Sequence, residues 1–354
     1  MKENYDKVIE ALRQTVIQKI DAEKKRMKTP PKEGEGFHYD PVRDLYIGDL
    51  GMVLDPNLHS VIRKRYKGNV PYFSAFLDAT YSEHDYRMIN ILEKSLKNDS
   101  KNEFSWRRLG SKYRNIGDYD KAIKSYKEAL KIDPNDEHNW NDLGFVYSQK
   151  HEYNKAIEAL KRSIEINPNF FYNWVNLGYV YQEKGVYNKA IEMHKHALEI
   201  DSKNQGVWSN LAYAYNHIGE YYKAIDACVH ALETRPYFAN PWCHLGFAYY
   251  KKGKLDKAIE LIKLSIEITP NYYRAWQNLG MIYYDKNNYD QAINAYRCVV
   301  ELLPNDCNAW YDLAKLLSEI GDYKEAIKAC NRSLDINSNF EKGIKLRNKL
   351  LLKK

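Results

Sequence analysis

The sequence contains no hydrophobic run near the roughly 18 apolar residues that a membrane-spanning helix requires, which excludes an integral helical membrane protein. Its first six residues, MKENYD, include no apolar stretch after a basic leader, so a secretory signal is not expected. The acidic residues there also argue against a mitochondrial transit peptide. We therefore expect a cytoplasmic protein.

Cysteine is scarce and widely spaced. There are five cysteines, an odd number without a CxxC pair. Disulfide frameworks and zinc knuckles depend on close, paired spacing, so neither is predicted. The five thiols are expected to be reduced, as is usual in the cytosol. They are Cys228, Cys243, Cys298, Cys307 and Cys330.

Motifs for catalysis or cofactor binding are also missing. The phosphate-binding patterns GxxxxGK[ST] and GxGxxG, the zinc motif HExxH and the GxSxG elbow do not occur. His194 and His196 are two residues apart, so on a helix they point in different directions and cannot share a metal. The sequence predicts no catalytic residue, no cofactor and no metal site. We therefore expect a non-enzymatic protein without a small-molecule substrate.

Large aromatic residues, in contrast, are abundant, and aromatics make up 14% of the chain. This composition excludes a mainly disordered protein. The tryptophans recur every 34 residues, and the same frame surrounds each of them. They are Trp106, Trp140, Trp174, Trp208, Trp242, Trp276 and Trp310. Each is followed by Leu after three residues, by Gly or Ala after four and by Ala after sixteen; Tyr follows after seven in all but one case, where Leu317 replaces it.

This frame resembles the tetratricopeptide repeat (TPR) family. Seven consecutive repeats cover residues 103–340 without an insertion or deletion. The resemblance implies an all-α, right-handed superhelical solenoid of antiparallel helix pairs with a concave groove. The repeat boundaries are 103–136, 137–170, 171–204, 205–238, 239–272, 273–306 and 307–340.

The conserved frame also has a direct physical reading within each repeat. Trp, Leu and Tyr at positions 4, 7 and 11 share one helical stripe, which is expected to be buried. Small residues at positions 8 and 20 let two helices approach closely. A glycine usually separates the helices and suits a left-handed backbone. His151 stands at that position in the second repeat and is expected to be strained.

The segments outside the repeats are assigned less specifically. Residues 1–68 should contain a helix over 4–28, with Tyr5, Ile9, Leu12, Val16 and Ile20 on one face, followed by an irregular segment. Residues 69–102 look like a degenerate repeat in the same register. Residues 341–354 should form a helix that caps the last repeat.

The resemblance further implies that positions 2, 5, 6, 9, 12 and 13 of each first helix face the groove. Position 9 supplies an aromatic strip, Phe145, Tyr179, Tyr213 and Phe247. Position 6 supplies a mainly amide ladder, Asp142, Asn176, Asn210, His244 and Asn278. Amides can pair with a peptide backbone while aromatics bury its side chains. These residues are our candidates for binding a protein or peptide ligand. In the competing interpretation, the amides bridge neighbouring helices and the aromatics pack on the next repeat.

Three function hypotheses remain. The first is a scaffold whose groove binds a segment of a partner protein. In the second, the N-terminal region occupies its own groove or that of a second copy, or simply caps the degenerate repeat. Homodimers through the terminal helices are also conceivable. RNA binding is the weakest hypothesis, because the net charge of +7 is concentrated in the basic tail over 341–354 and the repeats are balanced.

Overall fold

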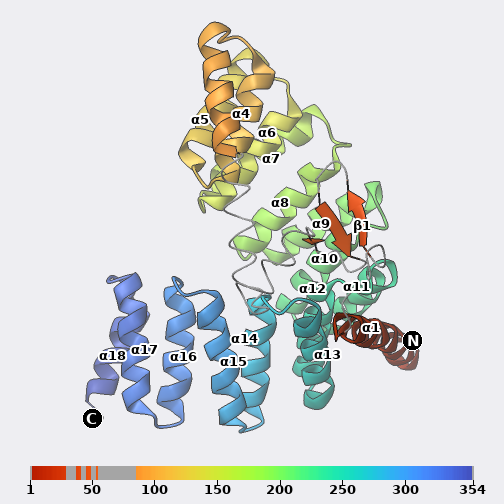
Figure 1. The fold of residues 1–354 in the computed structure, drawn as a ribbon, viewed down its shortest axis with the longest axis vertical. Coiled ribbons are helices and arrows are strands. Elements are labelled where there is room, and N and C mark those ends of the chain that lie inside the picture. The colour runs from red at the N-terminus through yellow and green to blue at the C-terminus, as the bar shows by residue number, and fades with distance from the viewer. Residues whose placement is uncertain (1, 29–36, 41–44, 49–52, 55–84, 353–354) are drawn as a thin grey trace. The chain divides into compact units, whose positions relative to one another are not determined.

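The structure is a computed structural model that describes residues 2–28, 37–40, 45–48, 53–54 and 85–352 (Figure 1). Each repeat is a pair of helices. The first helices have 13 residues each and are α4 (Glu103–Asn115), α6 (Glu137–Gln149), α8 (Phe171–Glu183), α10 (Gln205–His217), α12 (Ala239–Lys251), α14 (Tyr273–Asp285) and α16 (Cys307–Glu319). The second helices have 14 residues each and are α5 (Tyr119–Ile132), α7 (Tyr153–Ile166), α9 (Tyr187–Ile200), α11 (Tyr221–Thr234), α13 (Leu255–Ile268), α15 (Tyr289–Leu302) and α17 (Tyr323–Ile336).

The chain forms two compact bodies, which are described separately. Residues Ala22–Ala214 make the early-repeat body, and Met1–Asp21 with Tyr215–Lys354 make the late-repeat body. Within each body the two helices of a repeat pack on one another and on the next repeat, as α4 to α9 and α11 to α17 do. First helices also contact the first helices of neighbouring repeats, for example α6 with α8 and α12 with α14. This side-by-side arrangement gives each body a first-helix face and a second-helix face. The prediction of an all-α TPR solenoid is confirmed.

The turn between the paired helices has one recurrent backbone conformation. Five glycines, among them Gly117 and Gly185, have φ between 74° and 90°. His151 and Asn287 adopt the same left-handed region with φ of 59° and 56°, as expected for His151. The turn is closed by the amide of the following residue, so Glu152 N donates to the carbonyl of Tyr147 at 2.9 Å. The hydrogen bond needs that backbone shape, so histidine is tolerated there at the cost of strain.

Each tryptophan ties its repeat to the one before it. The indole N–H donates to the carbonyl of the residue six positions earlier, at 2.7–3.0 Å in all seven cases. That residue is Pro in five cases and Ser100 or Ser202 in the others. A backbone carbonyl is the acceptor, which explains why serine can replace proline. The expectation of a buried tryptophan stripe holds fully for Trp242 only, since the other six are partly exposed.

The region before the first repeat is only partly described. Helix α1 (Lys2–Lys28) buries Ile9, Val16 and Ile20, three members of the predicted apolar face. Three short strands follow, β1 (Phe37–Asp40), β2 (Leu45–Gly48) and β3 (Val53–Leu54), in an antiparallel sheet of order β1-β2-β3. Phe37 pairs with Gly48 and Ile47 with Val53. The prediction of a wholly irregular segment is therefore wrong for these strands.

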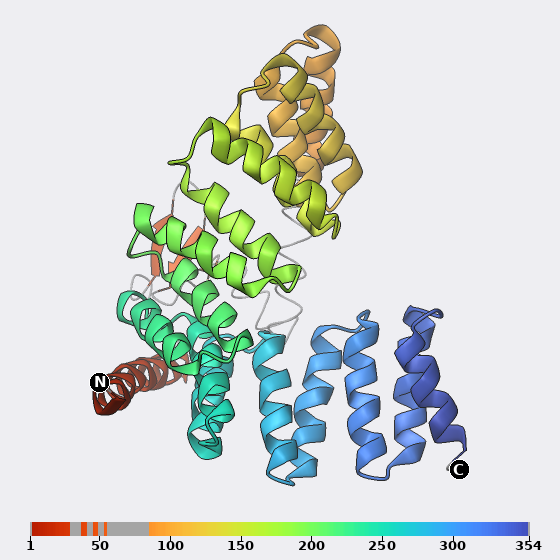
Figure 2. The same ribbon diagram turned by 180° about the vertical axis from the view of Figure 1, so that it is seen from behind.

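Residues 85–98 are helical, one repeat length before α5, and bury Ile89, Leu92 and Leu96. They supply the second helix that the proposed degenerate repeat requires, while 69–84 lies outside the described residues. At the other end, α18 (Glu341–Leu351) packs on α17 and α16. Its Leu350 is fully buried in the core of the last two repeats. Figure 2 shows α18 beside the preceding helices, as a capping helix should lie.

Candidate functional site

The position-9 aromatics are neither fully exposed nor fully buried in the structure. Phe145, Tyr179 and Tyr213 belong to the early-repeat body, and Phe247 belongs to the late-repeat body. The Arg114 guanidinium lies 5.6 Å from the ring centre of Phe145, and Lys251 Nζ lies 5.3 Å from that of Phe247. Tyr213 meets Tyr187 edge to face at 6.4 Å. Each ring therefore has neighbours within the fold and retains some accessible surface.

The position-6 ladder forms bridges between repeats. Asn176 Nδ2 donates to Oδ1 of Asn141 at 3.0 Å, and Asn278 Nδ2 to Sγ of Cys243 at 3.3 Å. Both acceptors stand at position 5 of the preceding repeat. The same pairing of position 6 with position 5 of the preceding repeat occurs at Asp312, which accepts from Gln277 at 3.1 Å. Asn210 follows Val175 at position 5, whose side chain has no polar atom, so this bridge cannot form there.

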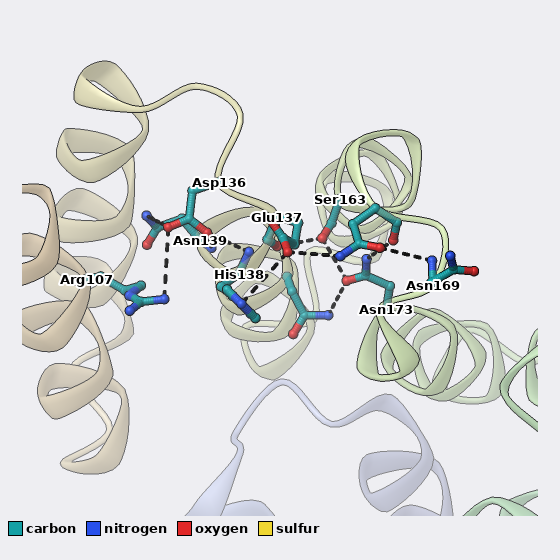
Figure 3. A network of polar contacts seen from close by, with 10 residues as sticks. Arg107, Asp136, Glu137, His138, Asn139, Ser163, Asn169 and Asn173 are labelled. Atoms are coloured by element: carbon teal, nitrogen blue, oxygen red, sulfur yellow. Dashed lines mark hydrogen bonds and ion pairs between the residues drawn. The ribbon is translucent and has the colours of Figure 1, made fainter. Parts of the chain in front are cut away.

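The bridge at Asn176 continues into a buried network (Figure 3). Asn141 Nδ2 donates to Oδ1 of Asn173 at 2.8 Å, and Ser163 Oγ lies 2.7 Å from the same oxygen. Ser163 Oγ also lies 2.5 Å from the carbonyl oxygen of Glu137. Asn173 and Ser163 are completely buried, where an unpaired polar group would be costly. The network joins repeats 2 and 3, so at least part of the amide ladder has the structural role that we had set against ligand binding.

Asp142 begins a polar hollow on the first-helix face of repeats 1 and 2. Its Oδ1 accepts from Arg114 at 3.0 Å. Burial raises the pKa of this carboxyl group, and the nearby Arg114 and Arg107 oppose that shift. The hollow has a volume of about 270 Å³. It is lined by Arg107, Arg108, Ser111, His138, Asn141, Asp142 and Phe170.

Most of this lining was missed as a site by the sequence analysis. Arg107, Arg108, Ser111 and His138 occupy positions 5, 6, 9 and 2, which the resemblance assigns to the groove. These residues are neither aromatic rings of the predicted strip nor amides, so the predicted strip and ladder do not include them. Arg107 approaches Asp136 at 4.0 Å, and Arg108 lies 5.4 Å from the ring centre of Phe104. The exposed rings of Phe104 and Tyr172, both at position 2, add apolar surface at the N-terminal ends of α4 and α8.

His244 differs from the other ladder members. Its side chain is only 8% exposed, and burial lowers its pKa to about 3, with a smaller contribution from Arg274. Asn216 Nδ2 donates to its backbone carbonyl at 2.9 Å. His244 is thus a neutral, packed side chain and the least accessible of the candidate contact residues.

In the described part of the chain, no group of three or more His, Cys, Asp or Glu side chains could hold a metal ion. No helix among the described residues is long and apolar enough to cross a membrane. The five cysteines are all free thiols. Burial raises the pKa of Cys243 to about 12, which Asn278 and Arg274 partly counteract.

Comparison with protein families gives one consistent result. The model described as TPR repeat matches residues 110–151, and models described as Tetratricopeptide repeat match 140–170, 159–192 and 206–238. The Tetratricopeptide repeat protein 21 C-terminal ARM domain matches 233–353. The chain belongs to the tetratricopeptide repeat family. In general terms it is therefore a protein-interaction scaffold.

No curated protein matches the sequence. Among solved structures, the APC/C hetero-tetramer Cut9-Hcn1 matches with a TM-score of 0.57 and 19% identity, over 74% of this chain. The match spans 52% of that chain, about half of its length. A tetratricopeptide repeat protein from Parabacteroides merdae matches with a TM-score of 0.59 and 14% identity, over 70% of this chain and 98% of the other. At these identities the similarity shows the fold.

Proposed function

We propose that the first-helix face of the early-repeat body binds a polypeptide segment of a partner protein. The observation that carries the proposal is the combination, on one face, of partly accessible rings at position 9 with the polar hollow of repeats 1 and 2. Aromatic rings can bury apolar side chains of a ligand, and the hollow offers guanidinium, amide and hydroxyl groups for hydrogen bonds. A preformed solenoid spares the entropic cost of ordering the receptor.

The bridging role of the amides refines the proposed contacts. The side-chain amides of Asn176 and Asn278 each donate a hydrogen bond to the preceding repeat, which leaves fewer donors for a ligand. The aromatic rings and the hollow should therefore contribute more to the affinity than the ladder. The main contacts would be Phe145, Tyr179 and Tyr213, supported by Arg108 and Ser111. Phe247 and Asn278 belong to the late-repeat body and are not part of this proposed site.

A binding selection tests this proposal. The full chain would be used to select ligands from a displayed library of random peptides, and affinities would be measured by fluorescence anisotropy. The triple variant Phe145→Ala, Tyr179→Ala, Tyr213→Ala should weaken a selected peptide at least about tenfold, since each buried aromatic contributes on the order of 1 kcal/mol or more.

The matched control is Ile132→Ala with Ile200→Ala. Both side chains are exposed and apolar, and both stand near the ends of second helices in the same body. The control should bind like the wild type, and circular dichroism should show equal helix content in all three proteins. Selected peptides that bind the triple variant and the wild type equally would rule out this face as the site.

A further inference from the structure

Helix α1 lies on the late-repeat body, beside α11 and α13, in both views of the fold (Figures 1 and 2). These are second helices of repeats 4 and 5. The Tyr5 hydroxyl donates to Asp226 of α11, and Arg13 pairs with Glu260 of α13. Asp226 and Glu260 both occupy position 22 of their repeats. Tyr5 and Arg13 are eight residues apart, so about 12 Å of helix separates them, enough to reach successive repeats.

A second group of contacts surrounds Asp6. Lys257 and Tyr249 both donate to Oδ1 of Asp6, and Lys254 Nζ lies 3.6 Å from its Oδ2. Burial alone would raise the pKa of Asp6, but the hydrogen bonds from Lys257 and Tyr249 outweigh it and lower the pKa. Farther along the helix, Lys19 Nζ lies 4.5 Å from the ring centre of Tyr237, in the turn after α11.

These contacts give α1 a defined recognition pattern. On one side of α1, Tyr5 contacts Asp226 and Lys19 contacts Tyr237. On the other side, Asp6 contacts Lys257 and Arg13 contacts Glu260. Asp6 and Arg13 are seven residues apart and so share a helix face. Ile9 and Val16, also seven apart, are buried on the same helix. An apolar stripe flanked by one acidic and one basic residue matches a surface that presents lysines beside a glutamate.

The contacts also indicate that this docking can be exchanged. The side chains of Asp6 and Glu260 remain 43% and 47% exposed. Ion pairs that stay this accessible to water hold two helices together only weakly. More than fifty residues separate α1 from the helix that begins at residue 85. Because α1 and this surface belong to one chain, α1 is present at a high effective concentration.

We propose that the surface of repeats 4 and 5 formed by α11, α13 and Tyr249 of α12 is a binding site for an amphipathic helix, and that α1 of the same chain is its resident ligand. A partner helix would need an acidic residue and, seven residues later, an arginine beside the apolar stripe. The site belongs to the late-repeat body, whereas the peptide site proposed above belongs to the early-repeat body, so neither proposal depends on the other. It differs from our earlier hypotheses, which placed this helix in the groove or on the degenerate repeat.

The test uses the full chain with α1 loosened by Asp6→Lys and Arg13→Glu. Hydrogen exchange of the α1 amides should become at least tenfold faster than in the wild type. A fluorescent peptide of residues 2–22 should bind the variant at least tenfold more tightly than the wild type, because α1 competes with the peptide in the wild type. A control with Lys7→Glu and Gln18→Lys, both on exposed positions of α1, should behave as the wild type.

Charge exchange provides a second, independent measurement. Arg13→Glu alone should speed exchange in α1, and adding Glu260→Arg should restore at least half of the lost protection. Equal α1 exchange in the wild type and in the Asp6→Lys, Arg13→Glu variant would overturn the proposal, as would a peptide that binds the two proteins with equal affinity or binds neither. Protection that rises with protein concentration would assign the site to α1 of a second copy and reject the intramolecular ligand.

Discussion

Leu160 fills the space that a side chain on Gly144 would need. A Cβ atom added to Gly144 would lie 2.6 Å from Cγ of Leu160, much closer than carbon atoms can approach. The two residues hold positions 8 and 24 of repeat 2. Where position 8 is alanine, as in Ala212 and Ala314, position 24 is a cysteine, Cys228 or Cys330. All four of these side chains are fully buried. The interhelical space is therefore shared between two positions of the same repeat.

This sharing predicts compensation between the two sites. Gly144→Ala should lower the free energy of unfolding by about 1–3 kcal/mol through overpacking, and Leu160→Cys by about 2 kcal/mol through the cavity it leaves. The double variant reproduces the pair found in repeats 4 and 7, so its loss should fall short of the sum by about 1 kcal/mol. Urea denaturation of the four proteins measures this cycle. Strictly additive losses would contradict the shared-space explanation.

His194 should make the stability depend on pH. It is completely buried at position 24, its Nε2 hydrogen-bonds to Oε1 of Gln182, and burial lowers its pKa to about 3. The unfolded chain takes up the proton near pH 6.5, whereas the folded chain resists it. The stabilising contribution is thus complete above pH 6.5 and is lost below it, by about 1.4 kcal/mol per pH unit.

Between pH 7 and pH 5 the wild type should therefore lose about 2 kcal/mol more than His194→Leu. Leucine suits the site because Leu160 packs against Gly144 in the same way that His194 packs against Gly178. Denaturation of both proteins at pH 7 and pH 5 measures their losses of stability. Subtracting one loss from the other cancels the contributions of titrating groups that both proteins share. Parallel pH profiles would show that His194 takes up its proton equally readily in the folded and unfolded chains, which would contradict this prediction.

The strained turn residue His151 should be replaceable by glycine with a gain in stability. Glycine has no steric penalty at φ of 59°, whereas an ordinary residue there costs about 1 kcal/mol or more. The gain is reduced because His151 Nδ1 contacts the Tyr153 hydroxyl at 2.8 Å on the surface. Asn287→Gly is the control and should gain less, because asparagine tolerates this conformation. Differential scanning calorimetry would show whether the melting temperature of His151→Gly rises.

The amide ladder can be divided by experiment into bridging and non-bridging members. Asn176→Ala removes the hydrogen bond to Asn141 and should cost about 1 kcal/mol of stability. Asn210→Ala removes no such bridge, since position 5 before it is Val175, and should leave stability within about 0.5 kcal/mol of the wild type. Thermal denaturation with circular dichroism provides the comparison. An unchanged stability for Asn176→Ala would return this residue to the ligand-contact interpretation.

Much of the architecture could be predicted from the sequence because a repeat contacts mainly its neighbours. The helix pairs, the left-handed turn at His151, the apolar face of α1 and a C-terminal helix with apolar residues such as Leu350 all follow from patterns within one or two turns of helix. The acceptor for the tryptophans could not be predicted, because it is a backbone carbonyl and has no signature in residue type. The short strands between residues 37 and 54 were also missed, since each has at most four residues and too little alternation to be recognised.

The candidate site was predicted only in outline. The resemblance to the repeat family assigned Phe145 and Asn176 to the groove side of the first helices. It could not show that Asn176 donates to Asn141 or that His244 is buried. Both facts depend on which residues of the neighbouring repeats pack against these side chains.

The sequence alone determined that this protein is a TPR array, because a 34-residue period of large and small residues specifies the packing of each helix on the next. The tertiary structure alone decided where α1 docks and where the hollow of repeats 1 and 2 lies. Such features are built from side chains far apart along the chain, such as Asp6 with Lys257, and their pairing has no periodic signal. It emerges only when burial and charge are satisfied together in three dimensions.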